Sequence, residues 1–205
     1  RHTLTVEHDG KCEEYRLMND NIINIYNSCA AITALHTVGL SYEQIRGAFE
    51  RLKIVTTRYE RVSAGDVNIT MQFAKGQNPS ACGRAFSYVA GHSGSNKSVL
   101  IMTDFQEKNE SESVCWLYDC DMSALADDSI GEIIFAGRRC RDQRLRAIMA
   151  GVPDSKIRIT DEPQDGVNMV DTKTHKEIFI LYQLYTIPAA IRAKRKLIER
   201  AEAEK

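Results

Sequence analysis

Two aspartates one residue apart, Asp119 and Asp121, are the side chains of this sequence that most directly suggest chemistry. They follow a short apolar run, residues 114–118, which contains the only tryptophan of the chain, Trp116. A run of this length between polar stretches predicts a buried strand that ends at Asp119. A carboxylate just beyond the carboxyl end of such a strand lies where open α/β sheets bind their ligands. Asp119, with Asp121 as second candidate, is therefore predicted to be functional; ordinary strand-end or helix-capping aspartates are the alternative.

Two further groups of polar residues have spacings that suit a ligand. Asn24 and Asn27 are three residues apart in a predicted helix, so both amides share one face and can reach one ligand; capping of the helix start is the alternative. Arg138 and Arg139 lie between a predicted strand and a predicted helix. There they can bind an anion, or pair with Asp142 across one helical turn.

Several common catalytic and binding patterns are absent from the sequence. It contains no G-x-G-x-x-G or Walker loop, so this chain has no phosphate cradle of its own. No Ser-His-Asp or Cys-His set is recognisable. The six cysteines are scattered without a C-x-x-C pair, which predicts reduced, mostly buried thiols in a cytoplasmic protein and no metal site.

The overall composition is that of an ordinary globular protein. With 205 residues, the chain has room for one domain, or for one domain and the remnant of a neighbour. The formal net charge of -1 excludes a strong overall attraction to nucleic acid or to an anionic membrane. No apolar run approaches the roughly 20 residues that span a bilayer, and no signal peptide is visible. Because the first residue is arginine and not methionine, we expect a fragment or an excised domain.

The first fifty residues predict a hairpin followed by two helices. Residues 3–7 and 12–18 flank Asp9 and Gly10, and Asp-Gly between two alternating segments is a strong hairpin signal. A helix capped by Asn19 or Asp20 then runs to about Val38. Ser41 is expected to cap a second helix, residues 42–52.

From there on, predicted strands and helices alternate. Such alternation indicates an α/β fold: a Rossmann-like, mostly parallel sheet with helices on both faces. The residues 58–61 that precede the first of these strands are interpreted as a charged connector. The predicted strands cover residues 67–73, 98–103, 130–136, 156–160 and 177–184, and the predicted helices cover 79–91, 139–150, 163–172 and the chain from Pro188 onward.

Taken in order, six segments resemble the C-terminal part of the MurT-like Mur ligases, over about residues 19–192. Two of them depart from the family pattern: Thr57 replaces a glycine, and Gly76 and Gln77 are extra residues. The segments are N-I-Y-N-S-C-A-A at 24–31, T-R-Y-E-R at 57–61, F-A-K-G-Q-N-P at 73–79, W-L-Y-D-C-D at 116–121, G-R-R-C-R-D at 137–142 with A-G-V at 150–152, and Y-T at 185–186.

The resemblance implies a domain organisation and a function. Residues 1–18 would be the last hairpin of the family's central ATPase domain, and residues 19–205 its C-terminal α/β domain. MurT-like proteins amidate the D-glutamate α-carboxylate of lipid II at the cytoplasmic face of the bacterial membrane. They use ATP with Mg²⁺, bound mainly by the central domain, which is not part of this sequence. Their partner is a GatD-like glutamine amidotransferase, which supplies ammonia; neither a nucleic acid nor a transmembrane segment is expected.

The resemblance also assigns roles to individual residues. A glutamine amidotransferase uses a cysteine nucleophile and a histidine base, and the histidine needs an acid to orient it. In this family the ligase partner supplies the acid, which would be Asp119 or Asp121. The family often has an aspartate three residues before the tryptophan; Ser113 stands there, with Glu112 as the nearest substitute. The residues that match family positions near the nucleotide are Asn24, Asn27, Arg58, Lys75 and Asn78.

Two other functions remain open at this point. The chain is compatible with another Mur ligase-type enzyme that joins a free amino acid through an amide bond. It is also compatible with a non-catalytic domain that docks an amidotransferase. In each case the fragment alone is expected to be inactive, because it has neither a P-loop nor an amidotransferase nucleophile.

Overall fold

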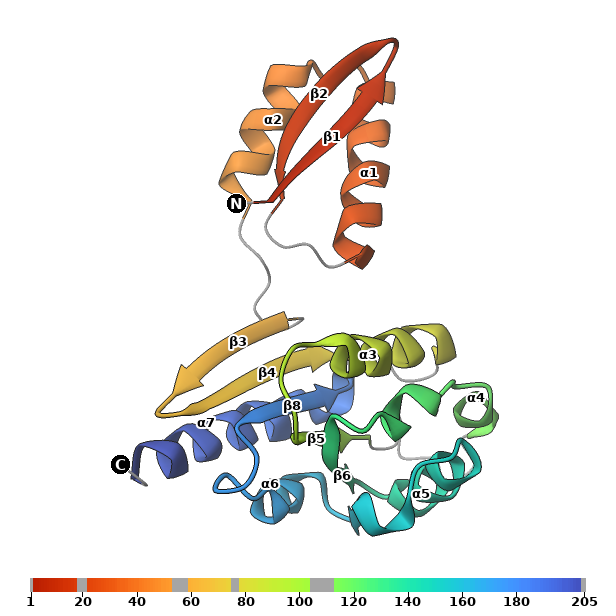
Figure 1. Ribbon diagram of the computed structural model, residues 1–205. Helices are drawn as coiled ribbons and strands as arrows, with labels where there is room; N and C mark the ends of the chain where they lie inside the picture. Colours follow the sequence, from red (N-terminus) through yellow and green to blue (C-terminus); the bar gives the residue numbers. More distant parts are fainter. Residues whose placement is uncertain (1, 18–21, 53–58, 75–77, 104–112, 204–205) are drawn as a thin grey trace. The chain divides into compact units, whose positions relative to one another are not determined.

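The computed structural model of the protein describes residues 2–17, 22–52, 59–74, 78–103 and 113–203. The chain divides into two compact units, Arg1–Val55 and Thr56–Lys205 (Figure 1). None of the helices in the described ranges combines the length and the apolar character needed to cross a bilayer.

The N-terminal unit is built on the predicted hairpin. Strands β1 (His2–His8) and β2 (Lys11–Leu17) pair antiparallel, with His8 opposite Lys11. The two turn residues between them, Asp9 and Gly10, have φ angles of 49° and 72°. A two-residue turn that matches the twist of a hairpin needs positive φ at both positions, and Asp-Gly supplies it at low cost. The hairpin prediction is confirmed.

Two helices complete this unit, α1 (Ile22–Thr37) and α2 (Tyr42–Arg51). At the start of α2, Ser41 and Gln44 form the reciprocal bonds of a capping box, as the sequence predicts for Ser41. Asn19 and Asp20, the predicted caps of α1, lie outside the described residues. The core cluster of the unit takes buried side chains from the hairpin and from both helices: Tyr15, Ile32, Ile45 and Phe49.

The compact unit therefore extends well past residue 18, where the boundary between segments 1–18 and 19–205 was expected. The hairpin shares its core with α1 and α2, because one face of a two-stranded hairpin needs a covering layer to become buried. The assignment of residues 1–18 to the end of an ATPase domain stays a prediction.

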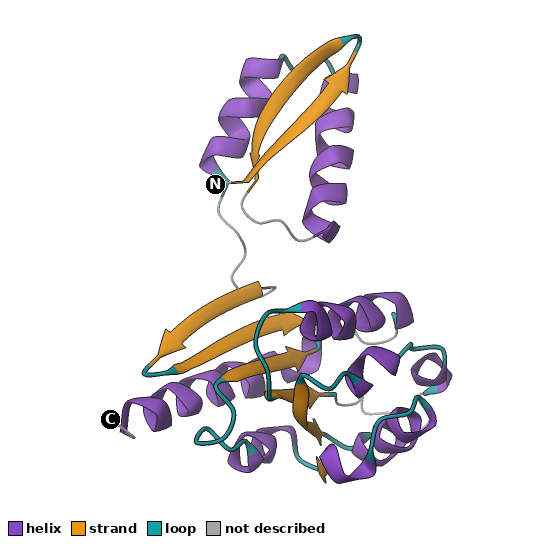
Figure 2. Cartoon of the chain, in the orientation of Figure 1, coloured by secondary structure: helices purple, strands orange, loops and turns teal. Residues whose placement is uncertain are grey.

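The C-terminal unit contains a six-stranded sheet with the order β3-β4-β8-β5-β6-β7 (Figure 2). Strand β3 pairs antiparallel with β4 at one edge, and all the other pairs are parallel. The predicted α/β fold with a mostly parallel sheet is confirmed. The strands are β3 (Tyr59–Ala64), β4 (Val67–Phe73), β8 (Glu177–Tyr182), β5 (Lys97–Met102), β6 (Ile130–Ala136) and β7 (Ile157–Thr160).

Helices cover both faces of this sheet, and each face has its own core (Figure 1). Successive residues of β5 alternate between the two: Val99 and Ile101 belong to one core, Leu100 and Met102 to the other. One face carries α3 (Pro79–Gly91), α4 (Cys115–Tyr118), the 3-10 helix η1 (Ser123–Ala126) and α5 (Cys140–Met149). The other carries α6 (Gly166–Met169) and α7 (Ile187–Ala203). Three more 3-10 turns are η2 (Asp154–Lys156), η3 (Pro163–Asp165) and η4 (Leu184–Thr186).

The order of the strands creates a switch point at β8. The strands on either side of it, β4 and β5, are followed by helices on the α3 and α5 face, whereas β8 leads into α7 on the opposite face. Open parallel sheets bind ligands outside the carboxyl ends of strands where the connections diverge in this way.

Two predictions about individual elements are wrong. Residues 114–118 do not form a buried strand; Cys115–Tyr118 is the one-turn helix α4, in which Leu117 is buried and Tyr118 is exposed. A short apolar run does not distinguish a strand from a single helical turn, so its pattern favoured the wrong element. Of the segment 58–61 interpreted as a connector, residues 59–61 belong to the edge strand β3.

Candidate functional site

Hydrogen bonds join the carboxyl ends of the central strands. The Thr186 hydroxyl accepts from the Gln183 backbone N–H at 3.0 Å and donates to the Met102 carbonyl oxygen at 3.1 Å. It therefore connects the end of β8 to the end of β5. This gives the threonine of the Y-T pair a structural role, because it is buried between the two strands.

Gly137 lies directly after the carboxyl end of β6, the next strand of the sheet. Its φ is +129°, and a Cβ atom built there would lie 1.8 Å from the Thr103 carbonyl oxygen. Only glycine tolerates both the backbone angle and the close approach of the β5 terminus. The glycine of the G-R-R segment is thus required by the fold, independently of any role in binding.

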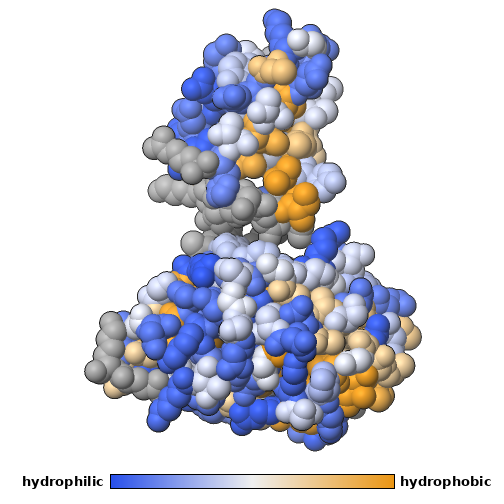
Figure 3. Space-filling view, in the orientation of Figure 1, coloured by the Kyte–Doolittle hydropathy of each residue, from blue (hydrophilic) through white to orange (hydrophobic). Residues whose placement is uncertain are grey.

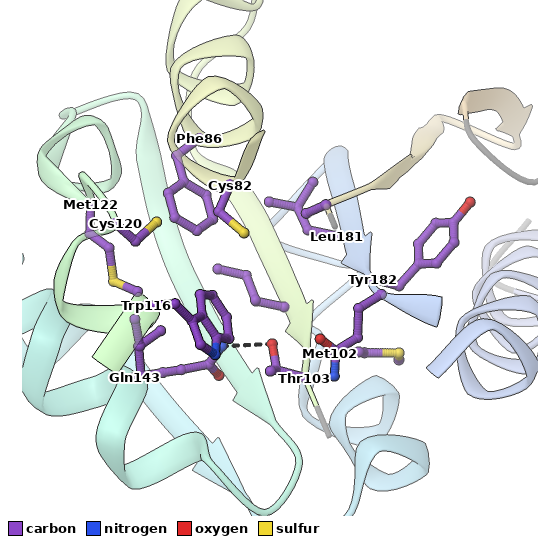
Figure 4. A pocket seen from close by; sticks show the side chains of 14 residues that line it. Cys82, Phe86, Met102, Thr103, Trp116, Cys120, Met122, Gln143, Leu181 and Tyr182 are labelled. Atoms are coloured by element: carbon purple, nitrogen blue, oxygen red, sulfur yellow. Dashed lines mark hydrogen bonds between the residues drawn. The ribbon is translucent and has the colours of Figure 1, made fainter. Parts of the chain in front are cut away.

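A small cavity lies at these strand ends, with a volume of about 20 Å³ available to the centres of water-sized molecules (Figure 4). That volume is enough for one or two waters. Gln143 donates from Nε2 to Thr103 Oγ1 at 2.7 Å, while its Oε1 is buried without a hydrogen-bond partner among the described residues. The apolar part of the lining includes Phe86, Ile101, Trp116, Leu117, Met122 and Leu181.

The turn that carries the two candidate aspartates is held from helix α5. Arg146 donates from Nε to the Tyr118 carbonyl oxygen at 3.2 Å and from Nη2 to the Cys120 carbonyl oxygen at 2.8 Å. Helix α3 approaches the same turn, because a Cβ atom on Gly83 would lie 3.4 Å from the Asp121 carbonyl oxygen. Residues 118–121 are therefore fixed between two helices and not part of a free loop.

The two aspartates of this turn differ in what they bind. Asp121 Oδ1 accepts the Ser123 backbone N–H at 2.9 Å, and hydrogen bonds from the Ser123 side chain and backbone lower the pKa of Asp121. Asp119 is exposed, and its carboxylate has no hydrogen bond or ion pair with any residue that the structure describes. Asp119 is consequently the one available to an external group, whereas Asp121 stabilises the turn.

Two thiols meet beside this turn. Cys82 on α3 and Cys120 after α4 are 6% and 0% exposed, and their side chains are hydrogen-bonded to each other. The hydrogen bond and burial raise the pKa of Cys82. The same bond lowers the pKa of Cys120, and the positive charge of Arg146 acts in that direction too. Both sulfur atoms belong to the wall of the cavity (Figure 4).

The predicted nucleotide-binding residues are distributed over the two units. Asn78 is the N-cap of α3: its Oδ1 accepts the Ala81 backbone N–H at 3.0 Å. Asn24 and Asn27 lie on α1 in the N-terminal unit, where Asn24 is half-buried and Asn27 is exposed. Arg58, Lys75 and Glu112 lie outside the described residues.

For the arginines after β6, the sequence left two roles open: anion binding, or an ion pair with Asp142. Arg139 Nη1 lies 3.5 Å from Asp142 Oδ2, an ion pair across one turn of α5. The pairing alternative therefore applies to Arg139. Arg138 is exposed.

Sequence reasoning missed the two α5 residues that face the site, Gln143 and Arg146. The pattern of α5 gave no signal for Gln143, because its partner Thr103 is forty residues away. The spacing of Arg146, four residues after Asp142, suggests only a surface ion pair along the helix, whereas Arg146 binds backbone carbonyls of the neighbouring turn. No group of three or more His, Cys, Asp or Glu side chains suited to a metal occurs among the described residues.

Helix α5 also presents a hydrophobic surface. Leu145, Ile148 and Met149 are 51%, 41% and 66% exposed, and Figure 3 shows hydrophobic side chains gathered over α5 on that face of the C-terminal unit. We call these three side chains the α5 patch. Contiguous exposed apolar groups of this kind mark interaction surfaces more often than solvated ones.

Comparison with known sequences connects this unit to one family. A family model described as MurT ligase C-terminal matches residues 76–187. The chain is 25% identical over 170 residues to the lipid II isoglutaminyl synthase (glutamine-hydrolyzing) subunit MurT of Streptococcus pneumoniae, covering 82% of this chain and 37% of that protein. It is 26% identical over 140 residues to the protein of the same name from Staphylococcus aureus strain COL, covering 68% and 31%. The chain thus spans about a third of the length of these relatives.

Solved structures agree on the fold. MurF from Acinetobacter baumannii superposes with a TM-score of 0.68 at 17% identity, covering 96% of this chain and 42% of that one. UDP-N-acetylmuramate-alanine ligase MurC from Thermotoga maritima gives a TM-score of 0.65 at 13% identity, covering 94% and 40%. At these identities the likeness concerns the fold alone.

Proposed function

The chain belongs to the family of MurT ligase C-terminal domains, and from this membership we propose that it is part of the ligase subunit of a lipid II isoglutaminyl synthase. The proposed reaction is the ATP- and glutamine-dependent amidation of the D-glutamate α-carboxylate of lipid II. It would take place in the cytoplasm, at the inner face of the bacterial membrane, during peptidoglycan synthesis. The names of the S. pneumoniae and S. aureus relatives support this reaction.

The observation that carries the proposal is the Asp119 carboxylate. It lies in the W-L-Y-D-C-D segment, inside the region that matches the family, and it is exposed on a turn that Arg146 and α3 hold in place. A carboxylate of that kind can be offered to another protein without the loss of an internal bond. Asp121 is less suited to the same role, because its Oδ1 already accepts the Ser123 N–H.

The proposed recipient is the catalytic histidine of a GatD-like glutamine amidotransferase. Asp119 would accept a hydrogen bond from Nδ1–H of that histidine. This bond fixes the tautomer whose Nε2 takes the proton from the nucleophilic cysteine, and it stabilises the imidazolium that forms. The ammonia released from glutamine would then be the nucleophile for amide formation in the ligase subunit.

The α5 patch supports a docking surface beside Asp119. Arg146 extends from α5 to the carbonyl groups on either side of Asp119, so the helix and the turn are in direct contact. Leu145, Ile148 and Met149 are exposed on that helix. A partner that covers the patch would lie next to the carboxylate, and water would be excluded around the shared hydrogen bond.

The nucleotide part of the proposal rests on fewer residues. ATP with Mg²⁺ would supply the phosphoryl group that activates the carboxylate, and it would be bound mainly outside this chain. Asn27 is exposed on α1 and thus accessible to a ligand, and Asn24, Arg58 and Lys75 are proposed as further contacts. Asn78 is the weakest candidate, because its carboxamide oxygen caps α3.

The experiment is glutaminase turnover in the complex of the full-length ligase subunit with its amidotransferase. Asp119→Asn should lower turnover at least about tenfold, which corresponds to roughly 1.4 kcal/mol of barrier. Asp121→Asn should have a smaller effect, because asparagine can still accept the Ser123 N–H. Asp127→Asn is the matched control: Asp127 is an exposed aspartate that accepts the Ser129 N–H in the same way, on a different turn.

The glutaminase assay and a ligation assay with free amino acids separate the rival functions. Unchanged turnover in both Asp119→Asn and Asp121→Asn would contradict the shared triad and favour a non-catalytic docking domain. If the full-length enzyme joins a free amino acid to its substrate and makes no amide from glutamine, the rival Mur ligase reaction is correct. Copurification with an amidotransferase alone does not distinguish these outcomes.

A further inference from the structure

We propose that Cys82 and Cys120 form a redox-active pair that a small peroxide oxidises to a disulfide, linking α3 to the turn that carries Asp119. The proposal concerns a modification site, and it does not depend on the proposed function. It rests on the position of the two thiols, on the cavity beside them and on the close approach of the two backbones.

The Cys120 thiol reaches the helix that carries Cys82. Cys120 Sγ donates to the carbonyl oxygen of Pro79 at 3.6 Å, in the first turn of α3 and three residues before Cys82. The next residues along each segment, Gly83 and Asp121, are so close that a Cβ atom on Gly83 would be in van der Waals contact with Asp121. A disulfide needs such proximity of both backbones, because its Cβ atoms are only about 4 Å apart.

A route for the oxidant is present as well. Cys82 and Cys120 both line the cavity at the ends of β5 and β8 (Figure 4). The cavity volume of about 20 Å³ suits one or two water-sized molecules, and hydrogen peroxide is a neutral molecule of that size. Gln143 Oε1, which has no hydrogen-bond partner among the residues that the structure describes, offers an acceptor for its O–H groups. The rest of the lining is largely apolar, which disfavours ions and large oxidants.

The environment assigns a different role to each sulfur. A hydrogen bond from Cys82 lowers the pKa of Cys120, and the Arg146 cation acts in the same direction against the raising effects of burial and Asp121; we therefore take Cys120 as the nucleophile. Its sulfur attacks one peroxide oxygen and the O–O bond breaks, giving a sulfenic acid on Cys120 and a hydroxide, which takes the Cys82 proton and leaves as water. The Cys82 thiolate then attacks the Cys120 sulfur, the S–O bond breaks, and the departing hydroxide takes a proton from solvent. In sum, two thiols and one peroxide give one disulfide and two waters; both sulfurs are oxidised and both peroxide oxygens are reduced.

The test is mass spectrometry of the full-length protein after exposure to hydrogen peroxide under native conditions. Remaining thiols are blocked by alkylation, and the protein is digested without reduction. We expect a linked pair of peptides containing Cys82 and Cys120, lighter by two hydrogen atoms than the separate peptides and resolved by dithiothreitol. Absence of this pair, at a peroxide concentration that oxidises the exposed Cys115, would overturn the proposal.

Variants assign the individual steps. In Cys82→Ala, a sulfenic acid should accumulate on Cys120 and react with dimedone, whereas in Cys120→Ala, Cys82 should stay reduced. Cys140→Ala is the matched control, because Cys140 is equally buried and hydrogen-bonded to Asp161, away from the pair; it should leave the linked peptides unchanged. Dimedone labelling of Cys82 in place of Cys120 would refute the assigned nucleophile.

Oxidant size tests the route through the cavity. Oxidised glutathione at the same concentration should form the disulfide at least tenfold more slowly than hydrogen peroxide. Equal rates with both oxidants would show that the thiols react after local opening of α3 and not through the cavity.

Discussion

Lys97 is a fully buried lysine at the start of β5. Its ammonium group donates to three oxygens: the carbonyls of Val89 at 2.9 Å and Ala90 at 3.0 Å, and Ser129 Oγ at 2.9 Å. The two carbonyls belong to the last turn of α3, where helix oxygens lack partners within the helix. Burial lowers the pKa of Lys97, and the three bonds explain why a cation is nevertheless retained there.

We predict that Lys97→Met destabilises the protein by about 1–3 kcal/mol. Methionine fills similar space, but Ala90 O and Ser129 Oγ lose the ammonium donor, and the Val89 carbonyl keeps only the His92 N–H. Urea denaturation followed by circular dichroism measures the change. Lys173→Met, at an exposed position, should stay within about 0.5 kcal/mol of the parent; an equal loss in both variants would contradict the capping role of Lys97.

A second prediction concerns alkaline pH. Burial, with a smaller contribution from Glu60, raises the pKa of Tyr182 from 10 to about 12. Below pH 10 the phenol is neutral in both the folded and the unfolded state, and its contribution to stability is fully present. Between pH 10 and 12 the unfolded state ionises first, so stability is lost as the pH rises. Between pH 9 and pH 11 the loss should be about 1 kcal/mol.

Tyr182→Phe should remove this part of the pH dependence. The unfolding free energies of parent and variant are compared at pH 9 and pH 11, and the variant should lose about 1 kcal/mol less. Tyr26→Phe, at a position that is 70% exposed, should follow the parent. Identical pH slopes for the parent and Tyr182→Phe would show that another group causes the alkaline loss.

At the level of elements, α5 contributes to the site by fixing the neighbouring turn. We predict that Arg146→Gln destabilises the protein by about 1–3 kcal/mol, because two carbonyl groups lose charge-assisted bonds. Arg144→Gln, on the same helix, removes an ion pair with Asp154 whose partners are 44% and 53% exposed; it should cost less than about 1 kcal/mol. Thermal unfolding of both variants is the measurement, and the reverse order would contradict the role given to Arg146.

The elements also show what a sequence can predict. Strand β6 has the predicted bounds because residues 130–136 are apolar enough to be buried on both faces of a sheet. Helix α3 begins where Asn78 and Pro79 indicate a helix start, and the two residues serve as its cap and first residue. These signals are local and need no knowledge of the rest of the fold.

The elements that were mispredicted depend on contacts from elsewhere in the chain. Helix α4 has only one turn, and its conformation is supported by Arg146 and α3, which the pattern of residues 114–118 does not reveal. In edge strand β3 only Ala64 is buried, so its residues lack a clear apolar pattern; the Gly65-Asp66 turn between β3 and β4 was the signal that could have identified it. The same distinction applies to the residues of the site. Asp119 could be predicted because it lies in a recognisable local segment, W-L-Y-D-C-D. Gln143 and Arg146 could not, because their hydrogen-bond partners are distant in sequence.

The whole molecule has separate hydrophobic cores in its two units. We predict that Ile45→Ala, in the core of the N-terminal unit, costs about 2–5 kcal/mol there, because it leaves a cavity in a small core. Native-state hydrogen exchange should report this loss in α1 and α2, while amides of β5 and β8 keep their protection. An equal loss of protection in β5 and β8 would mean that the two units unfold as one.

The position of β8 affects how the chain folds during synthesis. Residues 67–73 and 97–102 leave the ribosome well before residues 177–182 exist, yet β8 is the strand that pairs with both β4 and β5. Until then each of these strands has an open edge rich in apolar residues, which invites pairing with other chains. A polypeptide truncated before Glu177 would keep both edges open. We therefore expect the sheet to be completed late in translation, with nascent chains of intermediate length as the species most dependent on chaperones.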